Sequence, residues 1–318
     1  MTLRGAVDKL EWGLRVAGPL NTARGLLRYA RVMITRPNSA EVHLRSGPVL
    51  EFDFPSQMPP VLLVFGDLID PEFDFLRVVA ASNWQVLDIG AAIGQFSMFA
   101  AMHLPDATVH AFEPSSSNVT TLRRNIARNR VGERVHVHRA ALSDERGTML
   151  FETAAKTWMS QLVISDRESG PCRGELIPVE TLEATLEALR LEHVNVLKVN
   201  VAGFEPAVLR GALPSLAAGK IDILITLLGL ASLPIYKDIA DRGYRFFYYH
   251  PRRRQLYEVT RFDQDSVLGH RPWPARHIIG IRAGALDALI RNKVRISTSN
   301  SAAALAGSSG LVPSEAGT

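Results

Sequence analysis

Apolar runs of strand type alternate with helical patterns between residues 84 and 249, and no other feature constrains the fold as strongly. This alternation is typical of an α/β fold, in which helices connect the strands of a doubly wound, mainly parallel sheet. Between residues 148 and 180 the pattern changes, and we expect short extra strands beside the carboxyl edge of the sheet. The sequence predicts strands at 84–89, 107–112, 134–138, 194–200, 221–226 and 244–249, and helices at 94–103, 115–129, 181–190, 205–217 and 232–242.

Residues 1–45 form a separate basic segment, with eight Arg or Lys residues against three acids. Its apolar residues recur at helical spacing, which predicts two helices. We expect a helical N-terminal extension that packs on the main domain. The alternatives are a helix that lies on an anionic lipid surface and a helix that binds a partner. The first helical face carries Leu3, Val7, Leu10 and Leu14, and the second pattern runs through Leu20, Ala23, Leu27, Ala30 and Ile34.

The rest of the chain divides into a main domain, residues 46–290, and a C-terminal tail, residues 291–318. The stretch 297–318 has no aromatic residue and almost no charge. Such a segment cannot bury enough apolar surface to become ordered, so we expect the tail to be disordered.

The composition argues against several classes of protein. A single cysteine, Cys172, cannot form an internal disulfide, so a reducing cytoplasm is the expected compartment. No apolar run reaches the ~18 residues of a membrane span, and early charged residues argue against a signal peptide. The net charge of +4 argues against a nucleic-acid partner. No Cys and His spacing indicates a zinc site.

The stretch VLDIGAAIGQFS, residues 86–97, is the most informative for function. A predicted strand ends in a loop with Gly90 and Gly94 and continues into an apolar helix. Such glycines let a ligand approach the backbone, and the start of a helix offers free N–H groups. Ala92 stands where a dinucleotide fingerprint has its middle glycine. The carboxylate of Asp88 would suit the ammonium group of an amino-acid cofactor better than a pyrophosphate.

Two further acids follow later strands of the predicted sheet. Glu113 ends the second strand, where a carboxylate can accept hydrogen bonds from both hydroxyls of a ribose. Asp144 follows the third strand, within reach of an adenine amino group. The order of strand, DxGxxxG loop, helix, strand and glutamate favours S-adenosylmethionine as the cofactor. A nicotinamide or flavin nucleotide is the alternative.

Several stretches resemble the FkbM family of S-adenosylmethionine-dependent methyltransferases in their order and spacing. They are VLDIGAAIGQFSMFAA, VHAFEPSSSNVTTLRRNIARN, AALSDERG, VETLE and VLKVNVAGFEPAVLRGA, and the similarity covers roughly residues 45–250. The resemblance implies a class I methyltransferase (Rossmann-like) fold that methylates hydroxyl oxygens of sugars, glycans or secondary metabolites. It also implies a cofactor pocket lined by Asp88, Gly90, Gly94 and Glu113, with Asp144 near the adenine.

The fourth predicted strand departs from the family pattern. The family usually carries aspartate and glutamate where Asn200 and Ala202 stand, whereas Lys198 and Gly203 match. The fifth strand usually ends in glutamate, but DILITLLGL has none, and the glycine loop usually has asparagine where Ala92 stands. The cofactor half of the pattern is therefore kept, and the substrate half is altered.

These changes bear on the proton that a hydroxyl must lose. A positioned base commonly contributes ~10²–10⁴-fold to the rate of such a reaction. Asn200 can orient a hydroxyl but cannot deprotonate it, and Lys198 points to the same face of the strand. Lys198 is either a substrate contact or a structural partner of Glu205 or Glu175. Glu205 is the candidate replacement base, although an acid in the first turn of a helix also complements the helix dipole. We interpret three later histidines as surface residues, with a role as the base as the alternative: His250, His270 and His277.

Four arginines gather among tyrosines in residues 248–262, and either a solvated loop or an anionic acceptor explains them. They are Arg252, Arg253, Arg254 and Arg261. The leading prediction is an S-adenosylmethionine-dependent O-methyltransferase with a small-molecule or glycan acceptor. The rival is a catalytically impaired S-adenosylmethionine-binding scaffold or regulatory subunit, which the altered strand acids favour. Neither nucleic acid nor a membrane surface is an expected partner.

Overall fold

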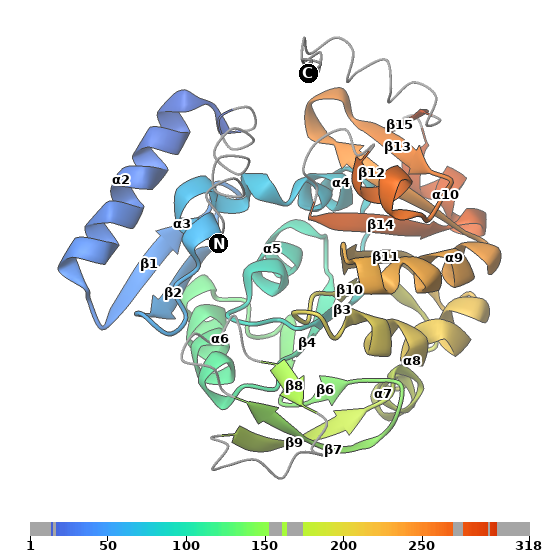
Figure 1. Ribbon diagram of the computed structural model, residues 1–318, viewed down its shortest axis with the longest axis horizontal. Helices are drawn as coiled ribbons and strands as arrows, with labels where there is room; N and C mark the ends of the chain where they lie inside the picture. Colours follow the sequence, from blue (N-terminus) through green and yellow to red (C-terminus); the bar gives the residue numbers. More distant parts are fainter. Residues whose placement is uncertain are drawn as a thin grey trace, which may run out of the picture.

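The computed structural model describes Leu14 and residues 17–152, 161–163, 174–269, 276–291 and 293–297. Within these residues the strands form a nine-stranded sheet, a four-stranded sheet and a two-stranded hairpin (Figure 1). Residues 298–318 of the predicted tail and most of the first predicted helix, residues 3–17, lie outside the described residues. The predicted disorder is wrong for the start of the tail, because residues 295–297 form an edge strand of the large sheet.

Five parallel strands form one side of the large sheet, from the edge strand β5 inward, in the order β5-β4-β3-β10-β11. They are β3 (Gln85–Ile89), β4 (Thr108–Phe112), β5 (Val135–His138), β10 (Val194–Val199) and β11 (Ile221–Leu227). Beyond β11 the sheet continues with β14 (His277–Arg282), β12 (Tyr244–His250), β13 (Gln255–Val259) and β15 (Arg295–Ser297). Strand β14 is antiparallel to β11 and β12, so its first residue lies at the edge where the parallel strands end.

The predicted α/β fold is confirmed. Every predicted strand is present in the large sheet, with each end within one residue of the expected position. The five predicted helices are equally close to their expected ends. They are α5 (Gln95–His103), α6 (Ser116–Asn129), α7 (Leu182–Leu189), α8 (Glu205–Ala217) and α9 (Leu233–Asp241). The sequence analysis missed β13, β14 and β15.

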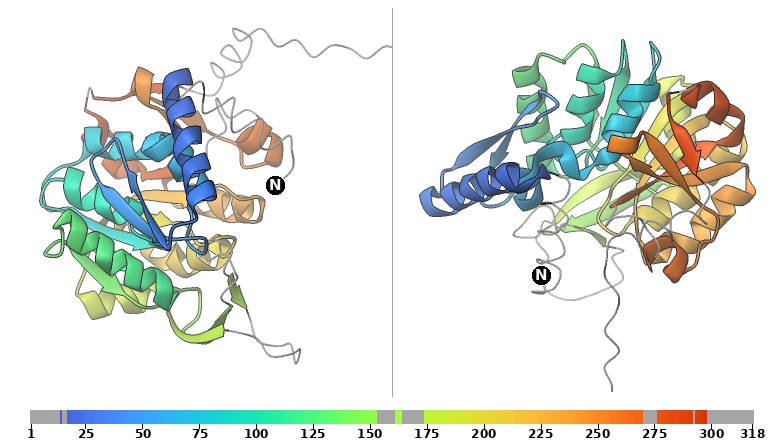
Figure 2. Two further views of the ribbon diagram at one scale, coloured as in Figure 1. Left: turned by 90° about the vertical axis from the view of Figure 1, so that its left-hand side faces the viewer. Right: turned by 90° about the horizontal axis from the view of Figure 1, so that it is seen from above.

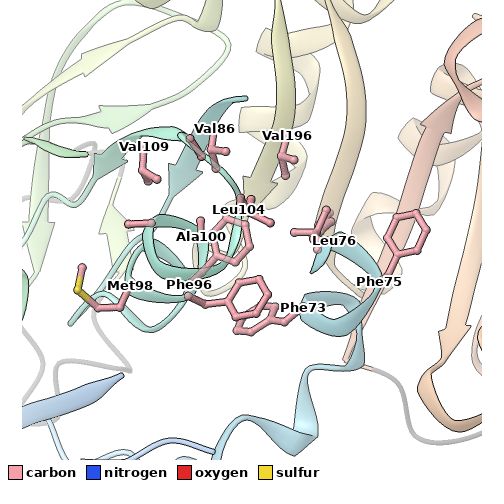
Figure 3. Close-up of a cluster of buried hydrophobic side chains, with 14 of the residues drawn as sticks. Phe73, Phe75, Leu76, Val86, Phe96, Met98, Ala100, Leu104, Val109 and Val196 are labelled. Atoms are coloured by element: carbon pink, nitrogen blue, oxygen red, sulfur yellow. The ribbon is translucent and has the colours of Figure 1, made fainter. Parts of the chain in front are cut away.

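Helices cover both faces of the large sheet and create two hydrophobic cores. Helices α5 and α6 lie on one face with α4 (Pro71–Val79) and α10 (Ala283–Ile290), whereas α7, α8 and α9 lie on the other. Side chains alternate between the two faces along each strand, so Val86 contacts the first core and Leu87 the second. In the first core, the rings of Phe73 and Phe96 lie with their centroids 5.2 Å apart and join α4 to α5 (Figure 3).

A smaller sheet borders the carboxyl ends of the five parallel strands. Its order is β6-β9-β7-β8, and its strands are β6 (Ala141–Leu142), β7 (Gly147–Glu152), β8 (Gln161–Val163) and β9 (Gly174–Glu180). Phe151 of β7 packs against Ile177 and Val179 of β9 in a core of its own. The prediction of short extra strands between residues 148 and 180 is therefore confirmed.

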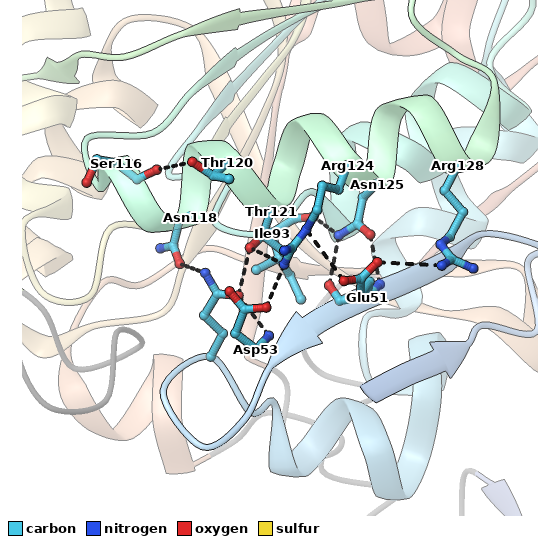
Figure 4. Close-up of polar contacts among 11 residues, drawn as sticks. Glu51, Asp53, Ile93, Ser116, Asn118, Thr120, Thr121, Arg124, Asn125 and Arg128 are labelled. Carbon is cyan, nitrogen blue, oxygen red and sulfur yellow. Dashed lines mark hydrogen bonds and ion pairs between the residues drawn. The ribbon is translucent and has the colours of Figure 1, made fainter. Parts of the chain in front are cut away.

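An antiparallel hairpin, β1 (Ser39–His43) and β2 (Val49–Asp53), docks on α6 (Figure 4). Two asparagine side chains of α6 take the place of a neighbouring strand. Asn125 accepts a hydrogen bond from the backbone N–H of Glu51 and donates one to its carbonyl, at 2.7 and 3.0 Å. Asn129 makes the same pair of bonds with Val49, at 2.9 and 2.8 Å. The free edge of β2 is thus hydrogen-bonded to α6 rather than to solvent.

Helix α2 (Pro19–Thr35) confirms the second predicted helix, but it does not pack by its apolar stripe. Leu20, Leu27 and Ile34 are 62%, 70% and 80% exposed, so the expected use of this stripe for packing is wrong. The opposite face contacts α3 (Pro60–Phe65) through Gly25, where a Cβ would lie only 1.8 Å from the carbonyl oxygen of Val64. The helix therefore stands at the side of the molecule (Figure 2). None of the described helices is long and apolar enough to cross a membrane.

Candidate active site

A cavity of about 440 Å³ lies at the carboxyl ends of β3, β4, β10 and β11. Its walls also include the segment around Gln57, Leu142 of the small sheet, and His277, the first residue of β14. Ligand pockets in α/β sheets are expected at this edge, and the volume is within the usual range of roughly 300–1,000 Å³. The fold therefore brings at least seven separate parts of the chain to one cavity.

The glycine loop after β3 forms one wall of the cavity. Gly90 has a φ of 81°, and a Cβ at this position would lie 2.1 Å from the carbonyl oxygen of Asn200, so only glycine fits. Gly94 precedes α5 with a φ of 97°, and it packs under Leu122 rather than lining the cavity. Ala92 also has a left-handed φ, 48°, which is uncommon for alanine. The loop thus turns the first N–H groups of α5 toward this edge of the sheet, where they have no intrahelical acceptor.

Glu113 lies on the cavity wall at the end of β4, as the sequence predicts. Its Oε1 accepts hydrogen bonds from the backbone N–H of Ser115 and the side chain of Asn118, at 3.0 and 3.1 Å. Its Oε2 accepts one from the backbone N–H of Ala92, at 2.9 Å. Burial raises the pKa of Glu113, against the opposite effect of these hydrogen bonds. Asn118 in turn accepts a hydrogen bond from Gln57, which links the acid to the N-terminal segment.

Asp88 lies beneath the cavity and is fully buried. Its Oδ1 accepts a hydrogen bond from the ammonium group of Lys198 at 2.9 Å, and its Oδ2 accepts one from the hydroxyl of Ser97 at 2.6 Å. The expected partners of Lys198, Glu205 and Glu175, are therefore wrong. Lys198 also lies over the ring of Phe96, 5.3 Å from its centroid, and reaches the cavity wall. With both oxygens occupied, Asp88 does not face the cavity as a free acceptor.

Asn200 lines the cavity, but Glu205 does not. The carboxylate of Glu205 accepts hydrogen bonds from the backbone N–H groups of Val201 and Gly203, at 2.9 and 2.8 Å. Glu205 is buried and stabilises the turn between β10 and α8. Because both of its oxygens are turned back onto this loop, the geometry does not support its predicted role as the replacement base.

Asp144 lies outside the cavity wall and pairs with Arg210 of α8 at 2.8 Å. Burial acts to raise the pKa of Asp144, but hydrogen bonds from Arg210 and Ser143 outweigh it and lower the pKa. The structure therefore does not support a contact between Asp144 and an adenine. Nor do the described side chains of the arginine cluster line the cavity, and Arg276 is the guanidinium that reaches its wall.

His277 is buried and lines the cavity, so its interpretation as a surface histidine is wrong. Its Nε2 lies 3.4 Å from the side-chain amide nitrogen of Asn200. On the other side of the ring lie two buried acids from the start of α4, Asp70 and Glu72. Sequence reasoning missed both acids, and it gave a role as the base to His277 only as the alternative. The available signal was the apolar run Ile278–Ile279 directly after the histidine, which indicates a strand that begins at His277.

The sheet order, the glycine loop after β3 and the acid at the end of β4 together define a class I methyltransferase fold. Residues 88–260 match the sequence model of the methyltransferase FkbM domain. This match spans more than half of the chain, which therefore belongs to the FkbM methyltransferase family, as its sequence motifs predict.

Two curated relatives and one solved structure illustrate the similarity. The "31-O-demethyl-FK506 methyltransferase FkbM" of Streptomyces tacrolimicus is 48% identical over 62 residues, which is 20% of this chain and 23% of the relative. "Methyltransferase 1" of Beauveria bassiana is 26% identical over 143 residues, 40% of this chain and 57% of the relative. The matched region thus spans less than two thirds of either relative. The methyltransferase FkbM structure from Methylobacillus flagellatus has a TM-score of 0.40 at 16% identity, over 85% of this chain and 60% of that one.

Proposed function

We propose that this chain is an S-adenosylmethionine-dependent O-methyltransferase that acts on a hydroxyl group of a sugar, glycan or secondary metabolite. The observation that carries the proposal is that the Gly90 backbone and the Glu113 carboxylate line one cavity. A carboxylate at this strand end can accept hydrogen bonds from ribose hydroxyls, and the glycine leaves the backbone accessible. Family membership supports methyl transfer, and the name of the Streptomyces tacrolimicus relative supports an oxygen acceptor.

The residues present fit such a cofactor. Oε2 of Glu113 accepts one hydrogen bond from the described residues and keeps a second lone pair for a hydroxyl. Phe112 and Leu142 add apolar surface to the same wall, which suits a purine ring. Asp88 is not available to an ammonium group while Lys198 holds it. When bound, S-adenosylmethionine supplies an electrophilic methyl group on a positively charged sulfur.

For the setting of the reaction, we propose the cytoplasm, a small-molecule or glycan acceptor and no nucleic-acid partner. The single cysteine supports a reducing compartment, and the net charge of +4 gives no support to nucleic-acid binding. Arg276 on the cavity wall supports an acceptor that carries a negative charge.

A cofactor-binding scaffold without turnover is the second candidate. Asn200 and Ala202 favour it, because the end of β10 offers no carboxylate to the cavity. Methyl transfer to a panel of sugars and hydroxylated metabolites separates the two candidates. A chain that binds S-adenosylmethionine but methylates none of them would favour the scaffold.

The cofactor assignment is tested by isothermal titration calorimetry with S-adenosylmethionine and its demethylated product. Glu113→Ala should weaken binding by more than ~1 kcal/mol, because the ribose hydroxyls lose their acceptor. Glu187→Ala is the matched control, since this acid lies exposed on α7, and it should bind as the wild type does. Tighter binding of NAD than of S-adenosylmethionine would refute the assignment.

A further inference from the structure

A cluster of three buried titratable side chains, Asp70, Glu72 and His277, lies against the cavity. Nδ1 of His277 lies 2.5 Å from Oε1 of Glu72 and 3.5 Å from Oδ1 of Asp70. Neither Nδ1 nor Oε1 of Glu72 has a hydrogen bond of normal geometry to any described residue. Buried polar atoms are rarely left in this state, so the cluster calls for a functional explanation.

The contacts on the two sides of the ring indicate where the imidazole carries its proton. Nδ1 of His277 lies beside Oε1 of Glu72 without hydrogen-bond geometry, and because an ionised carboxylate can only accept, this neighbour favours a proton on Nδ1. The amide nitrogen of Asn200 can only donate, and its position 3.4 Å from Nε2 is consistent with a lone pair there. A neutral imidazole with a carboxylate beside Nδ1 and a lone pair on Nε2 is the arrangement of a general base.

The charges around the cluster favour a proton over a metal ion. With both carboxylates ionised, Asp70 and Glu72 carry two negative charges. Among the described residues, the guanidinium of Arg276 lies beside them, 3.4 Å from Oδ1 of Asp70. Protonation of His277 makes the group neutral, whereas a divalent cation would leave it positive beside a sulfonium. Two atoms that bind one ion at 2.0–2.1 Å lie about 3 Å apart, farther than the contact between Nδ1 and Glu72. In addition, Gln95 already donates to Oδ2 of Asp70 at 2.8 Å.

We propose that His277 is the general base of this methyltransferase and that Glu72 is the positioning residue that fixes its tautomer. The inference rests on the proposed function. The acceptor O–H bond breaks as its proton moves to Nε2 of His277. The acceptor oxygen then bonds to the methyl carbon, and the carbon–sulfur bond breaks with its electron pair left on sulfur. His277 thus supplies from β14 the proton acceptor that Asn200 and Ala202 do not supply from the end of β10.

The tautomer is measured by ¹⁵N NMR on the full chain without cofactor at pH 8, with the His277 signals identified by their loss in His277→Gln. The expected state is a neutral ring with the proton on Nδ1. Glu72→Gln should shift the ring toward the Nε2-protonated form, while His43→Gln, at an exposed site, should leave the His277 signals unchanged. A wild-type ring that is protonated on Nε2, or on both nitrogens, would overturn the proposal whether or not an acceptor is known.

Turnover gives the second readout. For any acceptor that the wild type methylates, His277→Gln should lower kcat by about 10²–10⁴-fold and leave the Kd for S-adenosylmethionine unchanged. Unchanged kcat in this variant would overturn the proposal. Binding of added Mg²⁺ or Zn²⁺ that depends on Glu72 and is required for turnover would also overturn it, in favour of a metal site. Failure of the wild type to bind S-adenosylmethionine would instead count against the proposed function, because the tautomer is measured without that ligand.

Discussion

At the scale of single residues, two alanines adopt a backbone conformation that alanine normally avoids. Ala92 and Ala202 have φ values of 48° and 54°, in the left-handed region. This region costs a residue with a Cβ roughly 1–2 kcal/mol, and asparagine tolerates it better than alanine does. Both alanines stand where the family pattern usually has a polar residue. Both loops therefore adopt the left-handed conformation without a polar side chain at these positions.

The buried pair of Asp88 and Lys198 gives a prediction for stability. Asp88→Asn or Lys198→Met should each lower the free energy of unfolding by about 3–5 kcal/mol, because each leaves an uncompensated buried charge. The double variant should lose much less than the sum of the two, because neither charge remains. Urea unfolding followed by circular dichroism measures all three.

An exposed ion pair of the same type serves as the control. Asp241→Asn removes the partner of Lys237 at the surface of α9 and should leave stability nearly unchanged. Strictly additive losses in the Asp88 and Lys198 variants would show that the two side chains are not energetically coupled.

At the scale of elements, α2 is held by its small residues rather than by its apolar ones. Thr22 and Gly25 are the buried positions of this helix, whereas Leu20, Leu27 and Ile34 face outward. Periodicity predicted the helix correctly, because it depends only on local spacing. It failed to predict the packing face, because close approach of two backbones depends on the absence of a side chain at Gly25.

The apolar pattern of α2 suggests that a substitution at Leu27 costs more stability than one at Gly25. The structure predicts the reverse order. Gly25→Ala should lower the free energy of unfolding by about 1–3 kcal/mol, since the added methyl group meets the Val64 backbone. Leu27→Gln, on the exposed face, should change it by no more than about 0.5 kcal/mol. Thermal and urea unfolding of the two variants compare them directly. A larger loss for Leu27→Gln would mean that the exposed stripe is covered in solution.

At the scale of the whole molecule, a histidine cluster on β4 and β5 makes stability depend on pH. Burial, and then the neighbouring His138 and His136, lower the pKa of His110 to about 4. In the unfolded chain the pKa of His110 is near 6.5. Between pH 6.5 and pH 4, the unfolded state therefore binds a proton at His110 more readily than the folded state does. The contribution of His110 is therefore fully present above pH 6.5 and is lost as the pH falls toward 4.

This pH dependence is measured by urea unfolding between pH 7.5 and pH 4.5. The free energy of unfolding of the wild type should fall across this range, and His110→Gln should make the fall shallower. His43→Gln is the control, because His43 is exposed, and it should keep the slope of the wild type. Equal slopes in all three proteins would contradict the assignment.

The sequence predicted the part of the cavity around Gly90 and Glu113 better than the part around His277. Gly90 and Glu113 lie at the ends of strands whose apolar runs are long enough to recognise, and both line the cavity. His277 begins a short strand whose place depends on pairing with β11 and β12. The two acids beside His277, Asp70 and Glu72, lie at the start of α4. The contact between Arg276 and Asp70 joins residues that are 206 positions apart in the sequence. A local sequence pattern cannot predict a contact between residues so far apart in the sequence.

The place of β14 also sets an order of events during synthesis of the chain. β14 inserts between β11 and β12, so β12 cannot take its final position until residues 277–282 have been made. At about 5–20 residues per second, more than 160 further residues after Glu113 take on the order of ten seconds. During that interval the growing chain already contains Gly90 and Glu113 but lacks His277. The nascent protein would thus contain the proposed cofactor-binding residues before it contains the proposed base.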